Sequence, residues 1–290
     1  MSHIQIQNLS YKYPLGKNNV LQNINLEIEN GKLYTIVGEN GSGKTTLCNI
    51  LRGFIPWFHK GELDGSVIID GKDLLEYELE DLALKVGYVF QNPFTQISGI
   101  KETVFEEIAY GLENLGVESI EIEQRVNDVM NLLGIQYLKD KHPMNLSGGQ
   151  KQRVVFASII VMEPDILVID EPTSQLDPQG TEEIFNIINI MKQKGKTIIL
   201  VEHKMELIAE YSDYVLVLKD GELVISGKTE IVLTDERLLT YLGSLPQYAR
   251  LGIEMIKNDL LIEKIPITER ESIEIIMKCI LQENKVTEVS

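Results

Sequence analysis

The residues with the clearest chemistry lie between positions 38 and 46, where the chain reads Gly-Glu-Asn-Gly-Ser-Gly-Lys-Thr-Thr. This segment fits the pattern G-x-x-x-x-G-K-[ST] at every fixed position. The apolar run at 33–37 predicts a buried strand before it, and apolar residues at helical spacing follow it. A glycine-rich turn between a strand and a helix leaves backbone N–H groups free to surround a phosphate. We therefore predict an ATP site in which Lys44 reaches the β- and γ-phosphates and the Thr45 hydroxyl binds Mg²⁺. The residues predicted to bind ATP in this segment are Gly38, Asn40, Gly41, Ser42, Gly43, Lys44, Thr45 and Thr46.

Two carboxylates follow a second buried strand. The run 166–169 is apolar and rich in β-branched residues, and Asp170 and Glu171 come directly after it. Adjacent carboxylates at the carboxyl end of a sheet repel each other unless a cation or a reaction requires them. We expect Asp170 to hold Mg²⁺, directly or through water, and Glu171 to deprotonate the water that attacks the γ-phosphate.

Polar residues also end two other predicted strands. Gln91 follows the buried strand 87–90, and His203 follows the strand 197–201 and Glu202. The carboxyl ends of parallel strands are where α/β sheets bind ligands, so Gln91 is a candidate for facing the phosphates. A lone histidine is usually structural, but His203 repeats the pattern of polar residues at strand ends.

A second candidate anion site begins at Ser147, in the segment Ser147-Gly148-Gly149-Gln150. Ser147 is a good helix N-cap, and the two glycines leave the first amides of the helix unshielded. Helix capping alone is the alternative reading. Because this segment lies on the inserted helical lobe, we expect it not to reach the phosphate of its own chain. We therefore predict a two-fold dimer in which each lobe caps the nucleotide of the other subunit.

The remaining segments indicate an α/β fold. Alternating apolar residues predict strands at 3–9 and 21–28, with Asn30-Gly31 as a two-residue hairpin turn leading into the phosphate-loop strand. Tyr11 or Tyr13, at the end of the first strand, is a candidate for stacking on the adenine ring. Residues 101–142 are expected to form a helical lobe, and 215–226 a final hairpin. A small helical appendage begins near Gly227, with Thr268 predicted to open a capping box.

Composition places the chain among soluble globular proteins. It has 290 residues, 43% hydrophobic and 24% charged, and no apolar stretch of membrane-spanning length. The first five residues do not resemble a signal peptide, and Cys48 and Cys279 are expected to be free thiols. A net charge of −17 argues against binding nucleic acid or anionic lipid through the chain's own charge.

Taken together, these motifs resemble ATP-binding-cassette (ABC) ATPases over about the first 226 residues. The features that occur in the family's order and spacing are the phosphate loop, Gln91, the stretch Leu146–Gln150, the stretch Ile166–Glu171, the turn up to Asp177, and His203. The resemblance implies an α/β P-loop core with an antiparallel β subdomain and an inserted helical subdomain. We place the nucleotide-binding domain at 1–226, its helical subdomain at about 92–162, and a C-terminal helical appendage at 227–290.

The resemblance also implies roles for individual residues. Glu171 is the catalytic base, and His203 steadies the γ-phosphate and the attacking water. Gln91 senses the γ-phosphate and the metal. Asp177 communicates across the dimer. The signature segment contacts the nucleotide bound by the other subunit, and Ser147 and Gly149 touch its γ-phosphate. This segment consists of Ser147, Gly148, Gly149 and Gln150. The chain departs from the family's commoner residues at Gln175 and at Lys204, and neither departure removes a catalytic group.

Weaker features resemble one subgroup, the ATPases of energy-coupling-factor importers for vitamins and metal ions. These features are Phe90–Pro93 with Gln96, the stretch Met162–Asp165, and the tail from Gly227. The resemblance implies a second ABC ATPase, identical or paralogous, a membrane scaffold and a small substrate-binding membrane protein as partners. The chain would then lie at the cytoplasmic face of the membrane, with a helix of the scaffold gripped near Phe94 and Ile97. The loop at 53–63 hints at thiamine-precursor uptake, but the sequence does not identify the cargo.

Three other functions remain as alternatives. The chain could be the ATPase of an ordinary ABC importer or exporter, but the tail from residue 227 argues against this function. It could be a soluble ABC protein that acts on DNA or ribosomes, but the acidic net charge and the single cassette argue against this function. It could be a kinase-like P-loop enzyme, but the signature segment that begins at Ser147 argues against this function.

Overall fold

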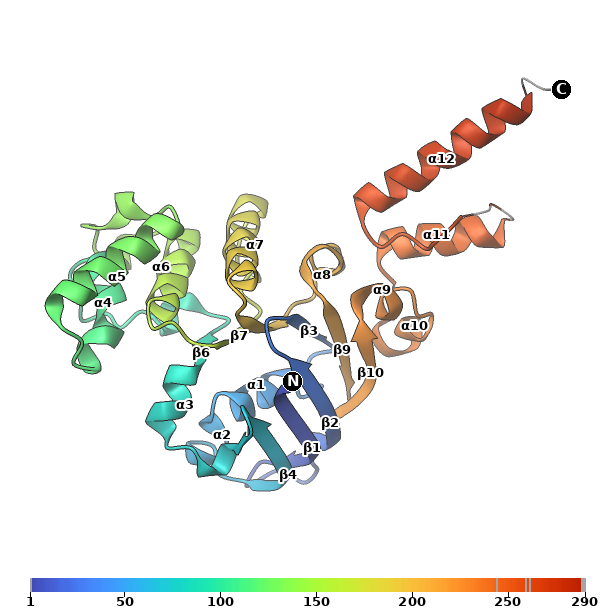
Figure 1. Cartoon of the computed structure of the whole chain (residues 1–290). Coiled ribbons are helices and arrows are strands. Elements are labelled where there is room, and N and C mark those ends of the chain that lie inside the picture. Colours follow the sequence, from blue (N-terminus) through green and yellow to red (C-terminus); the bar gives the residue numbers. More distant parts are fainter. Residues whose placement is uncertain (1, 244, 259, 261, 288–290) are drawn as a thin grey trace.

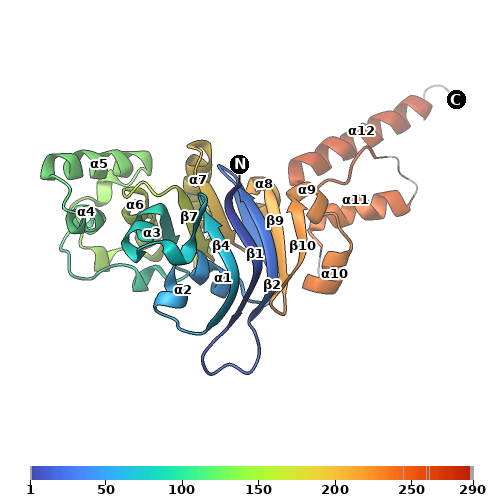
Figure 2. The same cartoon turned by 60° about the horizontal axis from the view of Figure 1, so that its bottom comes forward.

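The backbone is built on two sheets that face each other across the first helix (Figures 1 and 2). The computed structural model describes residues 2–243, 245–258, 260 and 262–287. The smaller sheet is antiparallel, and its strands in spatial order are β2 (Leu21–Glu29), β1 (Ser2–Lys12), β4 (Glu62–Ile69) and β5 (Lys72–Asp73). The larger sheet contains, in spatial order, β10 (Glu222–Lys228), β9 (Tyr214–Lys219), β3 (Leu33–Val37), β8 (Thr197–Val201), β7 (Ile166–Asp170) and β6 (Val86–Val89). Its pairings are parallel except for the β9–β10 hairpin.

Helices connect the parallel strands, as parallel pairing requires. The core helices are α1 (Lys44–Leu51), α2 (Phe54–Trp57), α3 (Leu79–Lys85), α7 (Pro178–Gln193) and α8 (Met205–Tyr211), with a 3₁₀ turn at Leu74–Glu76. The helical lobe between β6 and β7 contains α4 (Val104–Asn114), α5 (Ser119–Leu132) and α6 (Gly148–Ile160), with 3₁₀ turns at Pro93–Thr95, Gln136–Leu138 and Pro143–Asn145. The C-terminal part contains α9 (Thr229–Val232), α10 (Arg237–Leu242), α11 (Gln247–Lys257) and α12 (Glu269–Thr287).

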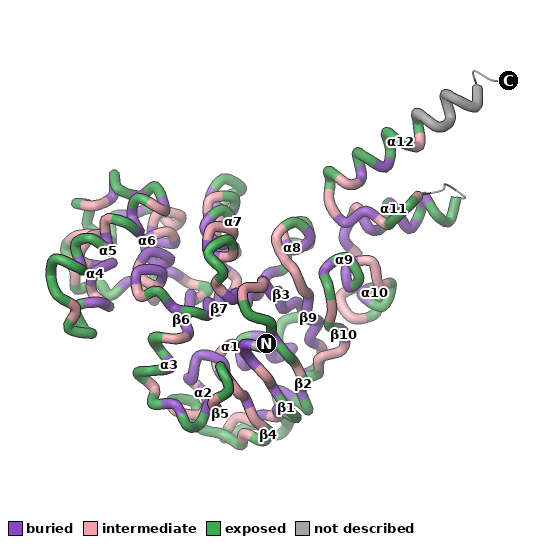
Figure 3. Tube along the Cα trace, viewed as in Figure 1, coloured by how far each residue is buried: buried purple, intermediate pink, exposed green. Residues whose placement is uncertain are grey.

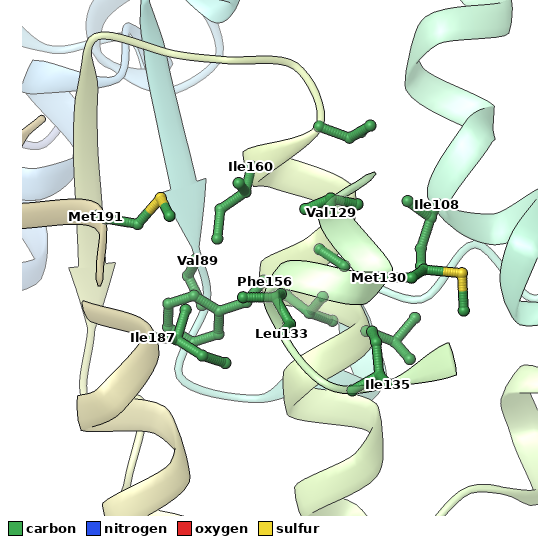
Figure 4. Close-up of a cluster of buried hydrophobic side chains, with 14 of the residues drawn as sticks. Val89, Ile108, Val129, Met130, Leu133, Ile135, Phe156, Ile160, Ile187 and Met191 are labelled. Carbon is green, nitrogen blue, oxygen red and sulfur yellow. The ribbon is translucent and has the colours of Figure 1, made fainter. Parts of the chain in front are cut away.

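The two largest of the three hydrophobic cores in the described residues lie on opposite faces of the larger sheet. One core joins the sheet to α7 and to the lobe, and Figure 4 shows Phe156 of α6 beside Ile187 of α7 and Val89 of β6. The other core lies between the two sheets and includes Leu47 and Ile50 of α1. Each parallel strand β3, β6, β7 and β8 is buried along its whole length, which explains its continuous apolar sequence (Figure 3). The sheet is thereby fixed between both cores, and its carboxyl edge is a rigid base for a site.

The expected hairpin at Asn30-Gly31 is wrong. β2 pairs with β1 in the small sheet, whereas β3 pairs with β8 and β9 in the large one. Both edges of β3 are therefore occupied by parallel neighbours, and the turn carries the chain from one sheet to the other. The Asp220-Gly221 turn, by contrast, joins the antiparallel strands β9 and β10 as predicted.

The C-terminal appendage is helical, as its sequence indicated, and α12 extends away from the body (Figures 1 and 2). The predicted capping box at its start is only half formed. The Glu271 amide donates to the Thr268 hydroxyl at 3.3 Å, but the Glu271 carboxylate accepts from the Ile267 amide rather than from Thr268. A neighbouring lysine, Lys264, holds the same carboxylate at 2.5 Å.

Candidate functional site

The phosphate loop connects β3 to α1 at the carboxyl edge of the large sheet. A Cβ on Gly38 would lie 2.3 Å from the Leu218 carbonyl oxygen, so only glycine fits there. Gly43 has a φ of 104° and caps α1, a conformation that favours glycine. The side chain of Lys44 folds back over the loop and donates to the carbonyl oxygens of Gly38 and Glu39 at 2.9 and 3.0 Å. Burial lowers the pKa of this ammonium, and the nearby carboxylates Glu171 and Asp170 oppose that shift.

The loop has a buried donor without a partner, which fits a phosphate ligand. The Ser42 hydroxyl is buried and forms no hydrogen bond with any described residue. A buried hydroxyl left unpaired is costly, and a phosphate oxygen would remove that cost. The loop as folded therefore suits a polyphosphate.

Oxygen ligands suitable for Mg²⁺ meet beside the loop. The Thr45 side chain lies close enough to the Asp170 carboxylate, at the end of β7, to lower the pKa of that carboxyl. Burial raises the pKa of Asp170, while the hydrogen bonds from Thr45 and Tyr88 act in the opposite direction. In the described part of the chain no three His, Cys, Asp or Glu side chains cluster as a metal site. A magnesium ion here would therefore take a hydroxyl, a carboxylate and oxygens from the phosphates and water, which suits its chemistry.

The Glu171 carboxylate lies between the two other polar residues predicted at strand ends. Its Oε2 accepts a hydrogen bond from Gln91 Nε2 at 2.7 Å, and its Oε1 lies 2.8 Å from His203 Nε2. The three residues follow β7, β6 and β8, which are neighbours in the sheet. Glu171 also has a φ of 45°, which is rare for a residue with a side chain and typical of functional positions. The structure thus brings together Glu171, Gln91 and His203.

Three supporting residues were not assigned a role from the sequence. Glu202 is buried, and its carboxylate accepts hydrogen bonds from the His203 amide at 2.8 Å and from the Thr173 hydroxyl at 2.7 Å. Gln96 holds the backbone of β6 and Phe90, just before Gln91, through two hydrogen bonds of 2.9 and 2.7 Å. Tyr88 donates to Asp170 at 3.1 Å. The polar character of Glu202 at a strand end was the only local signal for any of these roles.

The two tyrosine candidates for adenine stacking separate in the structure. Tyr11 is fully buried and its hydroxyl donates to the His59 carbonyl, so the prediction of stacking is wrong for this residue. Tyr13 is partly exposed, and its hydroxyl lies 3.3 Å from the Thr46 hydroxyl at the start of α1. Of these two tyrosines, Tyr13 alone keeps part of its side chain exposed beside the start of α1.

The Ser147 segment lies at a separate hollow. Ser147 and Gln150 form a complete capping box at the start of α6. The hollow has a volume of about 420 Å³ and is lined by Ser147, Gly148, Gly149, Gln150, Arg153, Gln175, Leu176, Asp177, Gln179, Gly180 and Glu183. No residue of the phosphate loop is among them. Asp177 has a local role here as well, because its Oδ1 accepts from the Gly180 amide at 2.7 Å and caps α7.

The two residues near which a scaffold helix is expected differ in exposure. Ile97 is 8% exposed and packs into the core of the lobe, whereas Phe94 is half exposed beside the ammonium of Lys151. Of the two residues, only Phe94 presents a side chain to a partner.

Comparison with known proteins agrees with this geometry. The family model described as "ABC transporter" matches residues 21–174. The chain belongs to the ABC transporter family. It is an ABC-type ATPase with the mixed α/β architecture of that family.

Curated relatives cover nearly the whole chain. A putative ABC transporter ATP-binding protein of Pyrococcus horikoshii is 41% identical over 95% of this chain and 97% of its own. The energy-coupling factor transporter ATP-binding protein EcfA2 of Clostridium perfringens is 40% identical over 87% of this chain and 89% of its own. The protein of the same name from Streptococcus pyogenes is 36% identical over 94% and 98%.

Solved structures agree. The cbiO1 protein of Clostridium perfringens, described as part of the ABC transporter complex cbiONQ, has a TM-score of 0.73 and 32% identity over 86% of this chain and 98% of that one. A dimeric ATP-binding cassette in a post-hydrolysis state, bound to ADP and Pi, has a TM-score of 0.67 and 27% identity over 78% and 98%. Across the described residues, no helix is long and apolar enough to cross a bilayer.

Proposed function

We propose that this chain is the ATP-hydrolysing subunit of an energy-coupling-factor-type importer for a vitamin or a metal ion. The observation that carries ATP hydrolysis is the position of the Glu171 carboxylate, within 2.8 Å of both Gln91 and His203 and next to the phosphate loop. The importer class is supported by the energy-coupling-factor relatives and by the neighbour from the cbiONQ complex.

In the proposed reaction, Glu171 accepts a proton from water as the water oxygen attacks the γ-phosphorus of ATP. The bond from the γ-phosphorus to the bridging oxygen breaks, and ADP and phosphate leave. His203 orients Glu171 and the water through its Nε2, and Gln91 holds the other carboxylate oxygen. Glu202 supports His203 by accepting its backbone N–H.

The phosphate loop binds the triphosphate through its amides, the Ser42 hydroxyl and Lys44, which would exchange its two carbonyl partners for phosphate oxygens. Tyr13 would stack on the adenine ring. Thr45 and Asp170 would hold Mg²⁺, with Gln91 as a further oxygen ligand. The metal would neutralise the charge that develops on the phosphates.

The working unit would be a dimer, with a second copy or with a paralogue. The hollow at Ser147 would close over the nucleotide of the other subunit, with Ser147 and Gly149 touching its γ-phosphate. Asp177, at the same hollow, would pass the state of one site to the other. Dimerisation is supported by the solved dimer of a related cassette.

The chain would sit at the cytoplasmic face of the membrane, held by a membrane scaffold that works with a small substrate-binding membrane protein. Residues 1–226 would form the nucleotide-binding domain, with the lobe at 92–162, and residues 227–290 the appendage. The appendage helices α11 and α12 carry exposed apolar side chains, among them Leu251, Ile276 and Met277.

The test is to purify the chain from its native membrane in mild detergent and identify its partners by mass spectrometry. A larger membrane protein together with a small membrane protein carrying a vitamin or metal would support the proposal and identify the cargo. Recovery with ribosomal or DNA-bound proteins, or with a conventional permease alone, would overturn it.

A further inference from the structure

A buried carboxylate at the edge of the site has no cationic partner. Glu202 follows β8 directly and is only 4% exposed. Among the described residues it takes part in no ion pair, whereas the neighbouring carboxylate of Glu171 lies 2.8 Å from His203. Burying a carboxylate without a counterion is costly unless hydrogen bonds replace the lost water. The donors around Glu202 therefore show what this carboxylate holds.

Three hydrogen bonds compensate for the burial of Glu202. Its Oε1 accepts from the amides of His203 and Lys204 at 2.8 and 3.1 Å. Its Oε2 accepts from the Thr173 hydroxyl at 2.7 Å, and Thr173 is 1% exposed in the turn between Glu171 and α7. Hydrogen bonds to an ionised acceptor are stronger than those between neutral groups. One carboxylate thus joins the backbone around His203 to the turn that follows the proposed base.

A second side chain joins the same two segments. The ammonium of Lys204 donates to the Thr181 hydroxyl at 3.1 Å, and Thr181 is 6% exposed in the first turn of α7. The Thr181 amide in turn donates to the carbonyl oxygen of Asp177 at 2.9 Å. Lys204 is one of the two departures from the family's commoner residues, and the proposed reaction gives it no role. The residues on either side of His203 therefore hold the chain both before and after Asp177.

The two links, from Glu202 and from Lys204, end on the turn that forms part of the hollow at Ser147. We propose that these two side chains are positioning residues that fix His203 relative to that hollow. His203 serves the nucleotide of its own chain, whereas the hollow would receive the nucleotide of the other subunit. A displacement of the turn is then passed to the His203 ring. This inference rests on the proposed function, because it takes both places to bind ATP.

The His203 ring depends on such links because little else holds it. Its side chain is 45% exposed, and among the described residues its ring hydrogen-bonds only to Glu171. Its orientation is therefore set mainly by its backbone, which Glu202 holds at the amide. Glu171 itself is fixed at the same strand end, since its amide donates to the Val201 carbonyl at 3.0 Å. A misplacement of about 1 Å in a reacting group can cost about 10²-fold in rate, so a loosened link should slow hydrolysis.

The test removes single hydroxyls from the full-length chain and measures kcat for ATP, the Kd for ATP and unfolding in urea. Thr229→Val is the matched control for Thr173→Val, because Thr229 is 5% exposed and its hydroxyl donates to the Ser212 carbonyl at 2.8 Å. We expect Thr173→Val to lower kcat about tenfold, the factor for losing one hydrogen bond to a charged group, with the Kd changed less than about threefold. Thr229→Val should also unfold at a lower urea concentration but keep kcat within about twofold of wild type.

The second link has its own pair of variants, which keep the test valid if Thr173→Val folds poorly. Thr181→Val and Lys204→Met each break the same hydrogen bond and should each lower kcat about threefold. The double variant should lose no more than either single change, because both remove one interaction.

A double-mutant cycle with His203 separates positioning from a general loss of stability. If the links act through the ring, Thr173→Val should change kcat less than about twofold in a His203→Ala background, and Thr173→Ser, which keeps the hydroxyl, should restore most of the wild-type rate. Strictly additive losses in that background, or rates for Thr173→Val and Lys204→Met equal to that of Thr229→Val, would overturn the positioning proposal alone. If Glu171→Gln hydrolysed ATP as fast as the wild type, the proposed function itself would fail.

Discussion

The substitution Glu171→Gln tests the proposed chemistry most directly. The glutamine amide has the shape of the carboxylate, and both neighbours can still be satisfied. Its oxygen can accept from Gln91, and its N–H can donate to Nε2 of His203 in the tautomer that carries the proton on Nδ1. The free energy of unfolding should therefore change by less than about 1 kcal/mol. The amide cannot accept a proton from water, so the chemical step loses its base.

The expected magnitude follows from that loss. A positioned general base contributes about 10²–10⁴-fold to a rate. The activation free energy should therefore rise by about 2.7–5.4 kcal/mol, at about 1.36 kcal/mol for each tenfold. ATP binding should stay within a few-fold of wild type, because the phosphate loop and Lys44 are untouched.

The assay compares phosphate release with equilibrium binding of a fluorescent ATP analogue at fixed Mg²⁺. Glu254→Gln is the control, because it removes an exposed carboxylate whose described partner is Lys257 on the same helix. We expect Glu171→Gln to bind nucleotide, to turn over at least 100-fold more slowly and to elute as a dimer with ATP. Turnover within threefold of wild type would refute Glu171 as the base.

Three further outcomes follow from the geometry. Ser147→Ala and Thr103→Ala each remove a capping box, and each should lower the free energy of unfolding in urea by about 1 kcal/mol. Only Ser147→Ala should also slow ATP turnover. Equal slowing by both variants would refute the proposed contact of Ser147 with the nucleotide of the other subunit. Gly38→Ala places a Cβ 2.3 Å from the Leu218 oxygen and should destabilise the fold by about 1–3 kcal/mol and weaken ATP binding, and unchanged thermal unfolding would contradict this. Burial raises the pKa of Asp170, so its ionisation weakens folding as pH rises through the shifted pKa. Asp170→Asn should therefore raise the free energy of unfolding at pH 7, and this increase should disappear below the ordinary aspartate pKa near 4. An increase that grows in acid would show that folding lowers the pKa of Asp170 instead of raising it.

Several features of the site could be predicted because they depend on local patterns. The phosphate loop is a contiguous motif, and its strand and helix are visible as apolar periodicities on either side. Glu171 and His203 follow strands that are buried on both faces and therefore read as continuous apolar runs. Parallel strands bring their carboxyl ends to one edge, so the meeting of these side chains follows from the strand pattern.

Strand pairing could not be predicted in the same way. The turn at Asn30-Gly31 has the composition of a hairpin, but β3 takes β8 and β9 as neighbours, 160 or more residues away in the chain. Which side chains become buried also depends on contacts between segments that are far apart in the chain. Tyr11 and Tyr13 have the same residue type and are two positions apart, yet only the packing of the small sheet decides which of them is enclosed.

The sequence by itself therefore determined the type of site, its phosphate loop and its polar residues at strand ends, because short-range patterns encode them. Only the tertiary structure decided which distant groups share a local environment. Arg52 follows a helix that looks ordinary in the sequence, and its contact with the rings of Phe54, Tyr88 and Phe90 becomes visible only in the folded chain. Burial depends on all neighbours at once, and no local pattern encodes it.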